Sequence, residues 1–130
     1  GPGALVQATK RKLDPTRLDA IVLSHRHLDH SGDINAMIEA MTDGGYRKRG
    51  VLFTPEDALE DDPVVFRYIR NYPERIEVLR ENSSYSMGEL KFSTAKRHVH
   101  SVETYGFNFY LSGSTVSYIT DTKFHPDLVT

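Results

Sequence analysis

The chain has 130 residues, of which 16 are Lys or Arg and 18 are Asp or Glu, so its formal charge at pH 7 is −2. This length fits a single domain, residues 1–130, with a small hydrophobic core. The weak net charge gives no overall basic field, so composition does not favour nucleic acid as a partner. Because cysteine is absent, disulfides and thiolate metal ligands are excluded, and any metal must be held by nitrogen and oxygen.

The sequence contains no signal for a membrane. No apolar run approaches the roughly 20 residues that a membrane-spanning helix needs, and no basic, hydrophobic leader comes before the first motif. We therefore expect a cytoplasmic protein without a membrane partner. Since the chain starts with Gly1-Pro2-Gly3 and not with methionine, we expect it to be part of a longer gene product.

The N-terminal third predicts a helix, a turn, a strand and a second helix. Leu5–Lys12 can form a short helix, which Asp14-Pro15-Thr16 ends with turn chemistry. Ala20–Leu23 is a continuous apolar run, typical of a strand buried on both faces. Ser31 is the expected N-cap of the next helix, which Gly44-Gly45 ends. The apolar stripe of that helix repeats every three or four positions: Ile34, Met37, Ile38 and Met41.

The middle of the chain continues this alternation. Val51–Phe53 predicts a second short strand, and Pro55–Leu59 predicts a helical turn with proline at its start. Pro63–Arg70 predicts one or two further helical turns. The order is therefore strand, helix, strand, helix, as in a sheet covered by helices.

The C-terminal half predicts β-structure, with short strands separated by turn residues. Hairpin turns are expected at Met87-Gly88-Glu89 and Ser112-Gly113-Ser114. The expected strands are Ile76–Leu79, Leu90–Thr94, Gly106–Leu111 and Val116–Thr120. Together the two halves predict one α/β domain, α+β in some schemes, in which sheets pack with helices.

Residues 24–33, Ser-His-Arg-His-Leu-Asp-His-Ser-Gly-Asp, concentrate metal-binding side chains directly after the first predicted strand. His25, His27, Asp29 and His30 place four imidazole or carboxylate groups within six positions, and these groups are typical ligands of catalytic zinc. Side chains two apart point the same way in extended chain, so His25 and His27 can bind one ion while Asp29 and His30 turn toward another. The spacing therefore predicts two metal ions.

Two later segments offer the same chemistry. His98 and His100 lie at strand spacing after the strand at 90–94, and one of them can complete a three-histidine site with His25 and His27. We favour His100, because His98 is better explained as a solvated or hydrogen-bonded histidine. Asp121 follows the last predicted strand, and a carboxylate suits a bridging position because each oxygen can hold one cation. The alternative for Asp121 is an ordinary turn residue.

On these three segments the chain resembles the metallo-β-lactamase superfamily. The resemblance rests on His25-x-His27-x-Asp29-His30, then His100-Ser-Val-Glu-Thr-Tyr-Gly-Phe, then Tyr-Ile-Thr-Asp121-Thr. The glycine and aromatic residue at positions 106 and 107 are most similar to the tRNase Z-like and cyclic-phosphodiesterase branch. The resemblance implies a four-layer αββα sandwich with the metal ions at one edge of two sheets.

The resemblance also implies a role for each candidate ligand. His25, His27 and His100 would hold the first ion, Asp29 and His30 would help to hold the second, and Asp121 would bridge them. Two divalent ions are implied, with zinc favoured over manganese or iron.

The family pattern extends beyond this chain at both ends. It has two strands before the position of Gly1 and a further metal-binding histidine well after the position of Asp121. His125 follows Asp121 too closely for that role and is a weaker candidate ligand. We therefore expect the chain to cover only the middle of the domain and the sandwich to be incomplete at both ends.

The expected activity is that of a dinuclear metal-dependent hydrolase. A water that bridges two cations has a pKa of about 7, so bridging hydroxide is the expected nucleophile. Asp29 is the expected proton acceptor and so the catalytic residue. Asp33, or a backbone carbonyl, is expected to orient a ligand histidine through its second ring nitrogen.

A small or nucleotide-like phosphodiester is the favoured substrate, with a lactone or thioester as the alternative and nucleic acid less favoured. Candidate phosphate-binding groups are Arg26, Arg47-Lys48-Arg49 and Lys96-Arg97, which otherwise form solvated faces.

The rival hypotheses concern the role of the whole chain. It could be a metal-binding module without catalysis, or a fragment of a longer hydrolase. An exposed sheet edge would favour a homo-oligomer.

Overall fold

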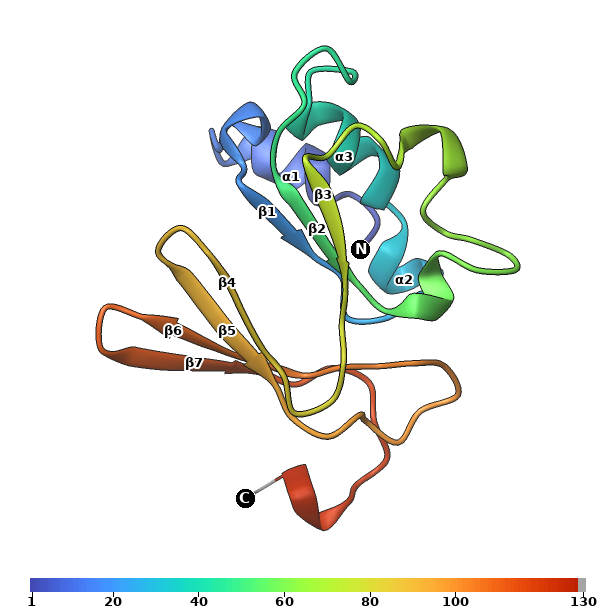
Figure 1. Cartoon of the computed structure of the whole chain (residues 1–130), viewed down its shortest axis with the longest axis vertical. Coiled ribbons are helices and arrows are strands. Elements are labelled where there is room, and N and C mark those ends of the chain that lie inside the picture. The colour runs from blue at the N-terminus through green and yellow to red at the C-terminus, as the bar shows by residue number, and fades with distance from the viewer. Residues whose placement is uncertain (129–130) are drawn as a thin grey trace.

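Two β-sheets face each other in the computed structural model, which describes residues 1–128 (Figure 1). The first sheet is parallel, and its strands are β1 (Ala20–Val22), β2 (Val51–Thr54) and β3 (Arg75–Val78), in that order. The second sheet is antiparallel, with neighbouring strands in chain order: β4 (Ser84–Met87), β5 (Leu90–Thr94), β6 (Phe107–Leu111) and β7 (Ser114–Tyr118).

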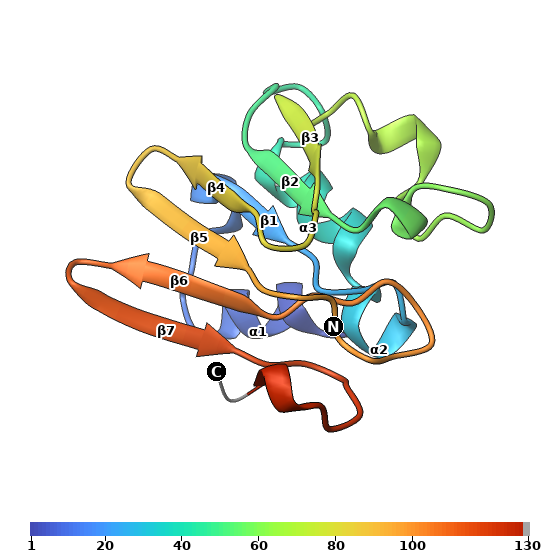
Figure 2. The same ribbon diagram turned by 60° about the horizontal axis from the view of Figure 1, so that its bottom comes forward.

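The helices lie on the side of the parallel sheet that faces away from the second sheet (Figures 1 and 2). They are α1 (Ala4–Lys10), α2 (Leu28–Ser31) and α3 (Ile34–Met41). Because parallel strands need a crossover, α2 and α3 connect β1 to β2. Within residues 1–128, no α-helix covers the outer face of the antiparallel sheet, so three layers of the expected αββα sandwich are present. The same residues include no helix with the length and apolar character to cross a bilayer.

Strand β2 is buried on both faces, as its continuous apolar run predicts, and it separates two core clusters. Leu52 points to the helix side, where it packs in one cluster with Ile38 of α3. Phe53 points to the other side, and its ring centroid lies 4.9 Å from that of Phe92 in β5. The second cluster therefore joins the two sheets and fixes the edge at which their strands end.

The predicted hairpin turns are confirmed. Gly88 (φ 57°) lies in the turn between β4 and β5, and Ser112 (φ 46°) and Gly113 (φ 84°) connect β6 to β7. In the turn between β6 and β7, positive φ at both central residues matches the right-handed twist of the strands that it joins. Strand β7 ends at Tyr118, two residues earlier than predicted. Strand β4 was not predicted, because its sequence has no apolar run: the exposed positions are occupied by Ser84 and Ser86.

The helical predictions need correction at several places. Pro55–Leu59 and Pro63–Arg70 form only single 3₁₀ turns, η2 (Glu56–Ala58) and η3 (Arg67–Ile69). Two more 3₁₀ turns are η1 (Pro15–Arg17) and η4 (Pro126–Leu128). Helix α1 ends at Lys10, because Lys12 has a φ of 58° that no helix can contain.

Ser31 is not the N-cap of α3. It is the last residue of α2, and its hydroxyl donates a hydrogen bond of 2.9 Å to the carbonyl of Arg26. The later part of the 24–33 motif, Leu28–Ser31, therefore forms a helical turn of its own, and α3 begins only after Asp33.

Candidate metal centre

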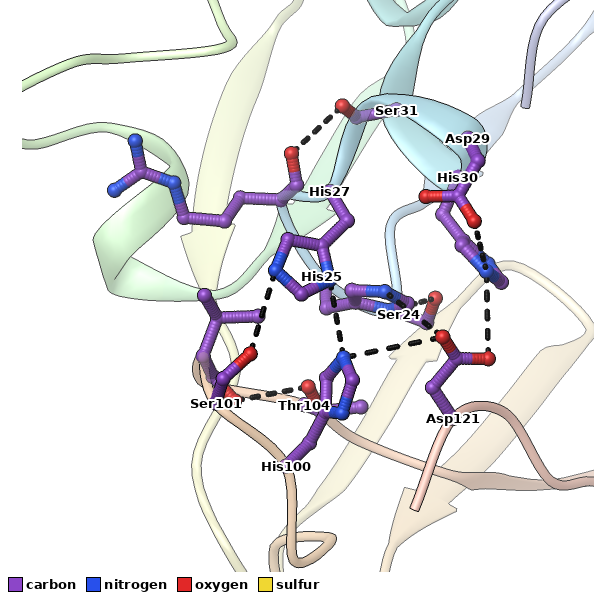
Figure 3. A network of polar contacts seen from close by, with 12 residues as sticks. Ser24, His25, His27, Asp29, His30, Ser31, His100, Ser101, Thr104 and Asp121 are labelled. Atoms are coloured by element: carbon purple, nitrogen blue, oxygen red, sulfur yellow. Dashed lines mark hydrogen bonds and ion pairs between the residues drawn. The ribbon is translucent and has the colours of Figure 1, made fainter.

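The predicted ligand residues come together where β1, β5 and β7 end (Figure 3). His25 and His27 lie in the loop after β1, and Asp29 and His30 lie on the short helix α2 that follows. His100 comes from the loop between β5 and β6, and Asp121 follows β7. Crevices outside the carboxyl ends of strands are where α/β sheets bind ligands. The chain thus gathers side chains up to 96 positions apart into one cluster.

The first donor group consists of His25, His27, His100 and Asp121, whose donor atoms all lie within 4.8 Å of one another. His100 Nε2 lies 3.0 Å from His27 Nδ1 and 3.8 Å from Asp121 Oδ2. Two nitrogens that bind one tetrahedral zinc at about 2.0–2.1 Å are separated by roughly 3.3 Å. The His27–His100 distance matches this separation to a few tenths of an ångström, and the other two donor groups of the set lie within reach of the same ion after side-chain shifts.

His25 forms the buried floor of this group. Its side chain is fully buried, and its Nε2 has no hydrogen-bond partner in the described structure, although it lies 4.0 Å from Asp121 Oδ2. The pKa of His25 is lowered to about 4, chiefly by burial and then by charge repulsion from His30, while Asp121 opposes the shift. The imidazole is therefore neutral at pH 7, as metal binding requires. An unpartnered buried nitrogen that faces a carboxylate fits an ion between them.

The second donor group consists of Asp29, His30 and Asp121. His30 Nε2 lies 3.6 Å from Asp29 Oδ2 and 3.5 Å from Asp121 Oδ1. Asp121 therefore belongs to both groups, with Oδ2 toward His25 and His100 and Oδ1 toward His30. This group is more open than the first, since the side chain of Asp29 is 76% exposed.

Asp121 is held beside His100 by contacts between their two segments. Lys123 donates its N–H to the carbonyl of Val99 at 2.8 Å, and Val99 donates its N–H to Thr122 Oγ1 at 3.1 Å. Val99 and Lys123 also form an isolated antiparallel bridge. The bridge explains why residues far apart in sequence, on either side of β6 and β7, meet at the site.

Three weaker candidates lie outside both donor groups. Asp33 does not orient a ligand histidine, because its Oδ2 accepts the N–H of Leu5 at 2.9 Å, and this bond lowers the pKa of Asp33. Asp33 thus caps α1, whose N-terminal amides need an acceptor. His98 is buried and belongs to neither donor group, and burial lowers its pKa. The ring of His125 lies 6.2 Å from that of His98, between centroids, and not among the ligands.

Serines adjoin the ligand histidines in places that the sequence analysis did not select. Ser24 Oγ lies 3.2 Å from His25 Nδ1, and Ser101 Oγ lies 3.5 Å from His27 Nε2. The orienting role expected of Asp33 therefore falls to Ser24 for His25. A serine next to a histidine is too common for the sequence alone to mark it.

Lowering the pH is expected to destabilise the metal-free protein through His25. Its pKa is about 4 in the folded chain and 6.5, the ordinary value, in the unfolded chain. Between these values the unfolded state binds more protons, so stability rises with pH across this window and is lost as the pH falls toward 4. When the pH falls from above 6.5 to 4, the unfolding free energy of wild type, measured by urea denaturation, should decrease by up to roughly 3 kcal/mol more than that of His25→Asn. Equal pH dependence in both proteins would contradict this assignment.

Comparison with known proteins agrees with this geometry. Residues 1–130 match the family of β-lactamase superfamily domains. MJ1374, an uncharacterized protein of Methanocaldococcus jannaschii, is 35% identical over 136 residues, which cover 99% of this chain and 50% of that protein. The metallo-β-lactamase fold protein YhfI from Bacillus subtilis matches in structure with a TM-score of 0.74 and 18% identity, over 99% of this chain and 51% of YhfI.

The structural match at this low identity shows the fold, and the family match covers the whole chain. The chain spans about half the length of MJ1374 and of YhfI. The fold, the family match and the order of the ligand-bearing segments agree, and the chain belongs to the metallo-β-lactamase superfamily.

Proposed function

We propose that this chain carries the metal-binding part of a hydrolase whose centre holds two divalent ions. The observation that carries the proposal is the orientation of Asp121, whose Oδ2 lies 4.0 Å from His25 Nε2 and whose Oδ1 lies 3.5 Å from His30 Nε2. A carboxylate presented in this way can bind one cation on each oxygen. Zinc suits the imidazole and carboxylate donors, with manganese or iron as alternatives.

Different residues of the site have different proposed roles in hydrolysis. When bound, two such ions lower the pKa of a coordinated water to about 7 and offset negative charge on the substrate. Asp29 faces both His30 and solvent, so its carboxylate can accept a proton at the site and release it to water. The buried ring of His25 closes the floor of the site against solvent.

A phosphodiester, small or nucleotide-like, is the proposed substrate class, which corresponds to the tRNase Z-like and cyclic-phosphodiesterase branch. Lys123 supports this choice, because it lines a depression of about 310 Å³ together with His100, Ser101 and Val99. A cation beside the first donor group can pair with a phosphate oxygen.

Three of the basic groups selected from the sequence are engaged elsewhere in the protein. Arg26 donates to the carbonyls of Asp57 and Asp62 at 3.2 and 2.5 Å, so its guanidinium serves the loop after β2. Arg49 pairs with Asp19 at 2.7 Å, and Lys96 pairs with Asp127 at 3.0 Å. The proposed attraction of phosphate therefore relies on the metal ions and Lys123, and not on these three side chains.

The test is hydrolysis of bis(p-nitrophenyl) phosphate by protein loaded with zinc or with manganese. We expect turnover by wild type and a kcat about 100-fold lower for Asp29→Ala, because the proton acceptor is removed. Asp33→Ala is the matched control, since it removes a carboxylate from the same segment that faces α1 and not the site. Its turnover per folded molecule should equal that of wild type.

Three outcomes would overturn parts of this proposal. Unchanged activity in Asp29→Ala would exclude Asp29 as the proton acceptor. Faster turnover of a lactone or thioester than of the phosphodiester would replace the substrate class. Bound metal without turnover of any of these substrates would favour a non-catalytic metal-binding module.

A further inference from the structure

Glu103, three residues after His100, uses both carboxylate oxygens for contacts within the protein. Oε2 accepts the N–H groups of Glu56 and Asp57 at 3.0 and 3.3 Å, and Oε1 accepts the hydroxyl of Tyr105 at 2.6 Å. Burial, followed by the contact with Glu103, raises the pKa of Tyr105, so the hydroxyl keeps its proton. Both carboxylate oxygens of Glu103 are therefore engaged by groups of the protein, although Glu103 is only three residues from His100 in sequence.

Asp57 returns a hydrogen bond to the same loop and also contacts the first metal motif. Its Oδ2 accepts the N–H of Glu103 at 3.0 Å, and its backbone carbonyl accepts Arg26 Nη1 at 3.2 Å. Arg26 lies between His25 and His27 in sequence. The turn η2 is thus bonded on one side to the segment that carries two ligands and on the other side to the loop that carries the third.

The loop around His100 is closed at its base and anchored next to His25. His98 donates its N–H to the carbonyl of Thr104 at 2.9 Å, and Tyr105 donates its N–H to the carbonyl of Ser24 at 3.1 Å. Thr104 is fully buried. These bonds close the loop on either side of His100, whose Nε2 lies 3.0 Å from His27 Nδ1. Near the base of the loop, the side chain of Glu103 connects it to η2.

We propose that Glu103 and Asp57 are positioning residues that hold His100 in register with His25 and His27. The pair acts through backbone amides and not through the ion, so it sets how well the three imidazoles are arranged before metal binds. Loss of a residue that supports a metal ligand costs about 10- to 100-fold in affinity. This inference rests on the proposed function, because it takes the three histidines to be metal ligands.

The test compares zinc affinities, measured by competition with a chromophoric chelator, and the visible spectra of the cobalt-substituted proteins. Glu103→Ala should bind the first zinc about 10- to 100-fold more weakly than wild type and change the cobalt spectrum. Glu103→Gln should restore most of the affinity, since its amide oxygen can accept the N–H groups of Glu56 and Asp57. Glu56→Ala is the matched control, because that carboxylate pairs with Arg80 at the surface of the same turn, at 2.7 Å. It should bind zinc like wild type.

A second control separates positioning from a general loss of stability. Ile38→Val removes one buried methylene of α3, from a residue that makes no contact with Glu103 or with a ligand histidine through a hydrogen bond, and should lower stability without weakening zinc binding. Equal zinc affinity in Glu103→Ala and wild type would overturn the positioning role. So would a loss of zinc affinity in both Glu103→Ala and Ile38→Val that is proportional to their loss of stability. Failure of wild type to bind zinc would instead overturn the proposed function, and the positioning role with it.

Discussion

An Asp121→Ala variant is expected to hold one divalent ion per chain where the proposed centre of wild type holds two. Without this carboxylate the second group keeps only Asp29 and His30, whereas the first group keeps three histidines. Three imidazoles suffice for a zinc site with one open position, but two protein ligands do not. Turnover should fall by more than about 100-fold, because loss of a residue that merely supports a ligand already costs about 10- to 100-fold.

The measurement is metal content after equilibrium dialysis, together with phosphodiester turnover of the same samples. Asp121→Asn keeps one acceptor oxygen and should retain more of the second ion than Asp121→Ala. The control is Asp127→Ala, which removes a carboxylate of the same C-terminal segment that is paired with Lys96 at 3.0 Å. If Asp121→Ala retained two ions, Asp121 would be excluded as the ligand that bridges them.

Local sequence patterns predict the parts of the fold in which neighbouring residues determine the structure. The strand β2 follows from its own apolar run, and the two hairpin turns follow from the glycines at positions 88 and 113. The structure has all three as predicted. Strand β4 could not be predicted in this way, because it is stabilised by its pairing with β5 and not by its own residue composition. The turns η2 and η3 are short because their segments are fixed by tertiary contacts, such as that of Arg70 with the carbonyl of Leu59.

The same distinction applies to the site. His25, His27, Asp29 and His30 are visible from their spacing, and His100 and Asp121 from their places after strands. The role expected of Asp33 is wrong, because its partner is an amide in α1, 28 positions away. Glu103 could not be selected from the sequence, since its partners are backbone amides 46 and 47 positions away. Contacts of a side chain with a distant backbone leave no pattern of residue types.

Phe53→Ala is expected to cause the largest loss of stability among single core substitutions, about 3–5 kcal/mol. Phe53 is fully buried in β2 and contacts the second sheet, with its ring centroid 4.9 Å from Phe92 and 5.6 Å from Tyr85. Truncation would remove a large apolar surface and leave a cavity where the two sheets meet, which the strands on either side cannot close. The measurement is the urea midpoint of the metal-free protein.

Phe124→Ala is the matched control, because it is the same substitution at a side chain that is 80% exposed, and it should change stability by less than about 0.5 kcal/mol. Phe53 also bears on the site, since its carbonyl accepts the N–H of Leu23 at 2.9 Å, two residues before His25. Because an ion that binds only the folded state stabilises it by mass action, zinc should raise the urea midpoint of Phe53→Ala. A loss below about 1 kcal/mol would contradict the packing of β2 against β5, and with it the alignment of strand ends that assembles the ligands.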